Sequence, residues 1–94
     1  MESMPKQFSP DRKAILERLR RIEGQLRGLQ RMVVEGRECT AILPQMAAVL
    51  AATKRAAYLL AYSSMRERLS TAIAEGRDPE AAVADLLHLL TRLP

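Results

Sequence analysis

Several residue types are scarce in this 94-residue chain. The single cysteine, Cys39, cannot form an internal disulfide, and a chain without disulfides is typical of a reducing compartment. No apolar run approaches the roughly 20 residues that a membrane helix needs. The opening residues also lack the apolar segment of a secretory signal. We therefore expect a cytoplasmic protein that does not cross a membrane.

The groups from which most catalytic sites are built are also scarce. The chain has one histidine, His88, and no tryptophan. No nucleophile is paired with a base in the sequence, and no glycine-rich phosphate loop is present. These absences predict that the protein is not an enzyme.

The apolar residues are mostly Leu, Ala, Val, Ile and Met, and only three residues are aromatic, a composition that favours helices over strands. We predict an all-α chain with one domain over residues 9–94, preceded by a flexible tail over residues 1–8. Start and stop signals divide this domain into three helices, at about 10–35, 39–75 and 79–92.

The signals at the helix ends are specific. Ser9 and Asp78 each precede a proline, which is the pattern of an N-cap followed by proline at the first helical position. Gly36 is placed to end the first helix. Pro44 is tolerated only near the start of the second helix and kinks that helix otherwise.

The first predicted helix carries a heptad pattern. Its apolar residues alternate in steps of four and three, which is typical of a helix packed lengthwise on others: Ile15, Leu19, Ile22, Leu26, Leu29 and Val33. Gly24 and Gly28 are four residues apart, so they lie near one face and favour close helix contact there.

The second predicted helix is long and apolar on more than one side between Ile42 and Leu60. A helix of its length extends about 54 Å. A compact monomer of this size has a radius of gyration of about 12–13 Å, and two shorter helices cannot cover such a rod. We therefore expect an antiparallel helical dimer or a dimer of dimers.

The positive charge is concentrated at one end of the chain. Residues 1–31 hold eight Lys and Arg against four acids, whereas the remaining residues hold seven of each. This asymmetry points to a polyanionic partner, either nucleic acid or a membrane surface, but charge alone leaves a merely solvated helix face equally open. The membrane alternative is the weaker one, because the basic helix has no Trp or Phe on its apolar face.

Two motifs resemble those of a known family. The segment RRIEGQLRG, Arg20–Gly28, is followed by CTAILPQMAAV, Cys39–Val49. This combination resembles the CsoR/RcnR/FrmR family of bacterial repressors, which sense copper, nickel or cobalt, or formaldehyde. The resemblance covers about residues 12–90. It implies a three-helix subunit with a long central helix, a disc-shaped homotetramer made of two dimers, and binding of double-stranded operator DNA without a helix-turn-helix.

The resemblance also indicates which residues contact DNA. Arg18 and Arg55 match basic positions that the family uses, and Arg21 lies one turn from Arg18. We predict that these three contact phosphates or groove edges. The secondary candidates are Lys13, Arg20 and Lys54.

The sensor positions depart from the family pattern. Copper sensors of this family use a cysteine, a histidine 25 residues later, and a cysteine or histidine four residues further on. These positions are Cys39, Ser64 and Arg68 here. Copper(I) prefers thiolate and imidazole, and a guanidinium has no lone pair to offer, so Ser64 and Arg68 disfavour copper. No metal ligand other than Cys39 is assigned.

Three interpretations of Cys39 remain open. It is a reactive thiol, a buried relic of an ancestral site, or a metal ligand with unexpected partners. Its place near a helix N-terminus favours the thiolate form, and so does the approach of Arg68 from a neighbouring subunit that the resemblance implies, while Glu38 opposes it. The leading functional prediction is a DNA-binding repressor that leaves its operator when a ligand or modification acts at Cys39. The alternatives are a copper-type metal sensor and a helical adaptor oligomer that binds no DNA.

Overall fold

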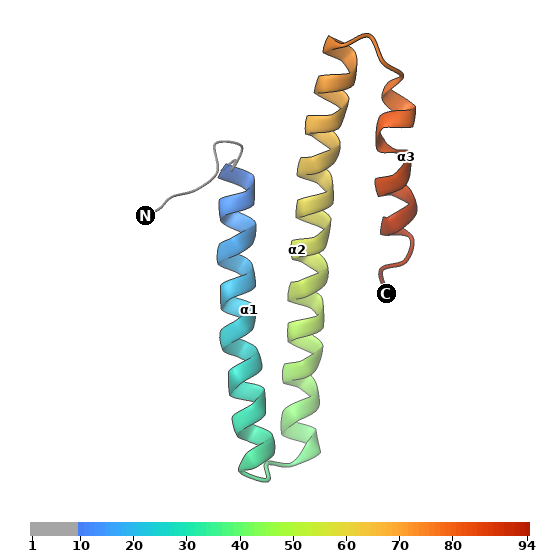
Figure 1. Cartoon of the computed structure of the whole chain (residues 1–94). Coiled ribbons are helices and arrows are strands. Elements are labelled where there is room, and N and C mark those ends of the chain that lie inside the picture. Colours follow the sequence, from blue (N-terminus) through green and yellow to red (C-terminus); the bar gives the residue numbers. More distant parts are fainter. Residues whose placement is uncertain (1–9) are drawn as a thin grey trace.

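The structure, a computed structural model, describes residues 10–94 and consists of three α-helices (Figure 1). Helix α1 is Pro10–Val34, α2 is Cys39–Ala74 and α3 is Pro79–Leu90. No strand occurs within the described residues, so the predicted all-α subunit with a long central helix is confirmed. The observed bounds lie within two residues of those expected from the sequence. The predicted tail and the Ser9 cap lie outside the described residues.

Glycine ends both of the longer helices in the same way. Gly36 and Gly76 adopt φ of 71° and 70°, a region that is strained for residues with a Cβ. After α1, the amide of Gly36 donates to the Val33 carbonyl at 3.1 Å and that of Arg37 donates to the Met32 carbonyl at 3.0 Å. This pair of bonds is the Schellman motif, which satisfies carbonyls that the helix end would leave unpaired.

The start of α3 follows the predicted capping signal. The Asp78 carboxylate accepts a hydrogen bond of 3.1 Å from the amide of Glu80, with Pro79 at the first helical position. Pro44 stands inside α2 beyond the first turn, which is the placement for which the sequence predicts a kink. The helix continues through it as one element (Figure 1).

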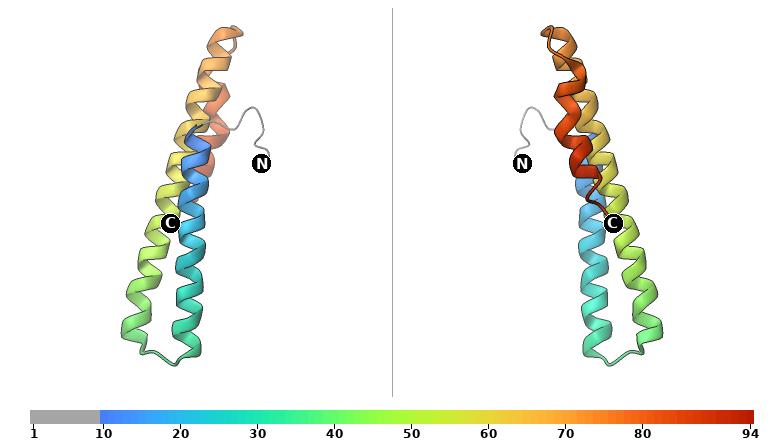
Figure 2. Two further views of the ribbon diagram at one scale, coloured as in Figure 1. Left: turned by 90° about the vertical axis from the view of Figure 1, so that its left-hand side faces the viewer. Right: turned by 90° about the vertical axis from the view of Figure 1, so that its right-hand side faces the viewer.

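The three helices form a single layer. Helix α2 packs on α1 along one side and on α3 along the other, and Figure 2 shows the layer edge-on. The Cα atoms extend over 58 × 36 × 12 Å, so the thin dimension is about one helix diameter. The radius of gyration is 17.7 Å, against about 12 Å for a compact domain of this length. One chain therefore has no interior of its own beyond the helix contacts.

The heptad pattern of α1 divides between two environments. Ile15, Ile22 and Leu29, each seven residues apart, are buried against α2. Leu19 and Leu26 remain 45% exposed and Val33 58% exposed. The steps of four and three therefore describe two adjoining rows, of which one is packed within the chain and the other faces outward. On α2 and α3 the buried residues are few and small: Ala56, Ser63, Ala72 and Val83.

Candidate nucleic-acid interface and sensor residues

A polar cluster joins the first turn of α1 to α2. The Asp11 carboxylate accepts a hydrogen bond of 2.6 Å from the Arg66 guanidinium and one of 3.3 Å from the buried Ser63 hydroxyl. The Arg66 guanidinium also lies over the Tyr62 ring, 5.4 Å from its centroid. These contacts fix the position of Arg66 between an acid and an aromatic face.

A cavity of about 330 Å³ opens beside this cluster, between α1 and α2. Arg18 lines it from α1, and Tyr62 and Arg66 line it from α2, together with the Asp11–Ser63 pair. Tyr62 is 59% exposed. The tyrosine ring is therefore available to a partner on this side of the layer.

Arg21 and Arg55 continue the same face toward the turn between α1 and α2. Arg21 follows Arg18 by three residues, and Arg55 precedes Tyr62 by seven, so each shares a helix face with a residue of the cavity. Because α1 and α2 are antiparallel, both arginines lie on the same side of the cavity along the helix axes. The three main DNA candidates from the sequence thus share one face.

The three secondary candidates lie elsewhere. Lys13 and Arg20 each precede a residue buried against α2 by two positions, about 200° around the helix, so they point away from α2. Lys54 lies 6.0 Å from the centroid of the Tyr58 ring and lines an apolar groove beside the end of α3, with Leu93. These residues are separated from the face that carries Arg18.

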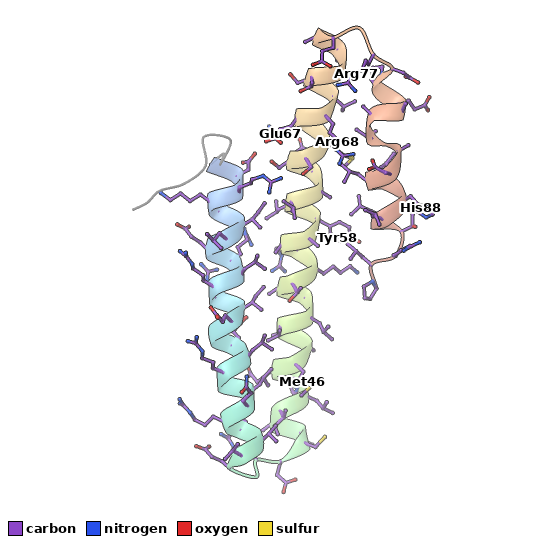
Figure 3. All side chains as sticks on the ribbon, viewed as in Figure 1. Met46, Tyr58, Glu67, Arg68, Arg77 and His88 are labelled. Carbon is purple, nitrogen blue, oxygen red and sulfur yellow. The ribbon has the colours of Figure 1, made fainter. Side chains whose placement is uncertain are left out.

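The three sensor positions are not brought together within one chain. Cys39 is exposed at the first residue of α2, and Ser64 lies 25 residues later, roughly 37 Å along the helix. Ser64 lines a pocket with leucines of α3. Figure 3 shows Arg68 between α2 and α3, far from the end of α2 that carries Cys39.

Arg68 has an acidic partner that the sequence did not reveal. Its guanidinium donates to the Asp85 carboxylate at 2.6 Å and to the Ala82 carbonyl at 3.4 Å. The hydrogen bond from Arg68 is the main cause that lowers the pKa of Asp85 below its ordinary value of 3.8. The positive charge at the third sensor position is therefore compensated within the chain, which weakens its expected effect on Cys39.

No ready metal site is present within residues 10–94, where no three His, Cys, Asp or Glu side chains lie close enough to share an ion. His88 is exposed on α3, and Figure 3 shows it on the side of α3 away from α2. Within the same residues, no helix is both long enough and apolar enough to cross a membrane.

The comparisons with known proteins agree with this architecture. Residues 11–92 match the family described as metal-sensitive transcriptional repressors. The chain belongs to this family. The copper-sensing transcriptional repressor CsoR of Bacillus subtilis strain 168 is 40% identical over 84 residues, which cover 89% of this chain and 82% of that protein.

Two solved structures share the fold. The nickel-responsive transcriptional regulator InrS has a TM-score of 0.74 at 38% identity and covers 98% of this chain and 100% of its own. The copper-sensing repressor CsoR with Cu(I) from Geobacillus thermodenitrificans NG80-2 has a TM-score of 0.76 at 33% identity, covering 98% of this chain and 92% of its own. The chain is thus a transcriptional repressor of a metal-sensing, non-enzymatic family.

Copper(I), the metal that the CsoR relatives sense, is a poor fit to the residues at the three sensor positions. A hydroxyl stands at the position of Ser64 and a guanidinium engaged with Asp85 at that of Arg68. Neither is a ligand that copper(I) prefers, so of the three positions only Cys39 offers a suitable donor.

Proposed function

We propose that this repressor binds double-stranded operator DNA as a homotetramer, a dimer of dimers, and leaves the operator when Cys39 is covalently modified. The observation that carries the DNA-binding part is the shared face of Arg18, Arg21 and Arg55 across α1 and α2. Guanidinium groups gathered on one face of a long helical layer suit the phosphates of a duplex.

The apolar residues left exposed support the assembly. Leu43, Met46 and Leu50 follow Cys39 in steps of four, three and four, so they share one side of α2, and all three side chains are exposed. Ser64 and Arg68 continue that side where α3 covers it. A second copy of α2, running antiparallel, would cover the part of this side that carries Leu43, Met46 and Leu50. It would also bring its own Ser64 and Arg68 toward Cys39.

The proposed inducer of this repressor is a compound that modifies the Cys39 thiol, rather than copper. The Cys39 sulfur would form a bond to an electrophilic carbon or to a polysulfide sulfur. The thiol proton passes to water, and the leaving group or the shortened polysulfide departs. With one cysteine per chain, the product is a capped thiol or a persulfide. A disulfide between subunits forms if the Cys39 thiolate of another subunit attacks that persulfide and hydrosulfide leaves. A copper-type sensor with unexpected ligands is the second candidate, supported by the copper- and nickel-responsive relatives.

The DNA-binding proposal is tested with Arg18→Ala and Arg55→Ala. Binding is measured by fluorescence anisotropy on duplex DNA selected by the protein from a randomised pool. Each variant should weaken binding about tenfold or more, and should lower the slope of log affinity against log salt by about 0.9 for each phosphate that the variant no longer reaches. Arg77→Ala is the matched control, because Arg77 is exposed at the α2–α3 turn and pairs with Glu75. Unchanged affinity in both variants would favour the adaptor function.

A further inference from the structure

We propose that the cavity between α1 and α2 receives one backbone phosphate of the bound duplex, and that Tyr62 and Arg66 contact it beside Arg18. The inference rests on the proposed function, because it assumes that this face meets DNA. It adds two contact residues that the resemblance does not indicate, and it names the chemical group that the cavity takes.

The cationic donors of the cavity favour an anion, and the cavity is large enough to admit a phosphate group. The volume of about 330 Å³ is bounded by side chains from both helices, so a ligand there is held from two sides. Arg18 is half-buried, and among residues 10–94 no ion-pair partner neutralises it. A guanidinium that is partly removed from water and lacks a partner gains more from an incoming anion than a fully solvated one.

Arg66 retains donors for a second contact. Its Nη2 atom is 2.6 Å from Asp11, and a guanidinium carries five N–H donors in all. The Tyr62 ring lies under the guanidinium, which holds the group in place. The Tyr62 hydroxyl supplies a neutral donor at the same site, of the kind that commonly binds phosphate oxygens.

The charges at the cavity remain positive in sum. Arg18 and Arg66 contribute two positive charges and Asp11 one negative charge, which leaves a net charge of +1. Asp11 thus orients Arg66 and at the same time repels a phosphate. Removing the acidic charge while keeping an oxygen for Arg66 and Ser63 should therefore strengthen DNA binding, which is an unusual result for a substitution at an interface.

The experiment compares single variants of the full-length protein on the selected duplex. Tyr62→Phe keeps the ring and removes the hydroxyl, and it should weaken binding about tenfold without changing the salt slope. Tyr58→Phe is its matched control, because Tyr58 also lies near a cation, Lys54, but does not line the cavity. Arg66→Gln should weaken binding by a similar factor and lower the salt slope by about 0.9, as expected for one phosphate.

Asp11→Asn should change the DNA affinity in the opposite direction. It should tighten binding about fivefold, as expected for removal of one repelling charge near a solvated phosphate. A gain of affinity cannot arise from loss of folded protein, so this variant is informative even if Arg66→Gln is unstable. A gain in Asp11→Asn without a loss in Tyr62→Phe would reflect the charge of the face alone and would refute the phosphate site.

Two outcomes separate the inference from the function on which it rests. If Arg18→Ala and Arg55→Ala lose DNA binding while Tyr62→Phe behaves like Tyr58→Phe and Asp11→Asn does not tighten binding, the phosphate site is refuted and the DNA-binding function stands. If Arg18→Ala and Arg55→Ala both retain full affinity, the proposed function fails and the phosphate site fails with it.

Discussion

The double substitution Leu19→Ala/Leu26→Ala tests whether the outward row of α1 is an interface between subunits. Each leucine is 45% exposed in the single chain, so about half of its apolar surface is left to be covered by another copy. Full burial of a leucine side chain contributes about 1.5–3 kcal/mol, which makes the remaining half worth about 1 kcal/mol. A symmetric dimer buries four such side chains, for a total of about 4 kcal/mol.

This free energy corresponds to roughly three decades in the dissociation constant of the dimer. The parent protein should sediment at about four times the chain mass at micromolar concentration, and the double variant should dissociate to smaller species at the same concentration. Ile73→Ala is the control, because Ile73 is also exposed but follows Tyr62 by eleven residues and so lies on the basic face. A stable parent monomer would refute the reasoning, and so would equal dissociation of the Ile73 and double-leucine variants.

Three further predictions concern single residues. Electrophiles or polysulfide should release DNA from the parent protein and not from Cys39→Ser. If the protein instead binds one copper(I) per site in competition with a chelator, and this binding releases DNA, the protein is a metal sensor and the thiol proposal is wrong. Asp85→Asn should lower the melting temperature at pH 7. Because the Asp85 pKa is lowered in the folded state, its contribution is present above the ordinary value of 3.8, and the difference between variant and parent should vanish as pH falls through the lowered folded value; a difference that persists in acid would contradict the role of the Arg68 pair. Gly28→Ala should raise stability by about 1 kcal/mol in thermal unfolding, because no atom lies within 4 Å of an added Cβ, and a loss of stability would instead indicate that another subunit packs against that glycine.

The helices were predictable because their signals are local. Asp78 with Pro79, and the left-handed Gly36, act within a few residues of the helix ends that they define. Periodicity also identified the apolar row of α1, but it could not distinguish Ile22, which packs within the chain, from Leu26, which faces outward. Both residues are apolar and they lie one turn apart, so only the placement of α2 separates them.

The polar contacts of the candidate site were not predictable in the same way. Asp11 meets Arg66 across 55 residues and Asp85 meets Arg68 across 17, and no sequence spacing encodes either pair. The exposed Tyr62 was also missed, because a tyrosine on a helix is usually assigned to packing. The resemblance supplied Arg18 and Arg55, whereas the cavity beside Arg18 came only from the packing of α1 on α2.

The layer that is one helix thick has a consequence for how the protein exists at low abundance. A chain that spans only 12 Å in its thin dimension leaves many of its leucines exposed, so we expect folding to be coupled to association with a second copy. The melting temperature would then depend on protein concentration, and dilution at constant temperature would favour the unfolded chain. Newly made chains would be open to proteolysis until their concentration allows pairing, which sets a lower limit on the abundance at which the repressor can act.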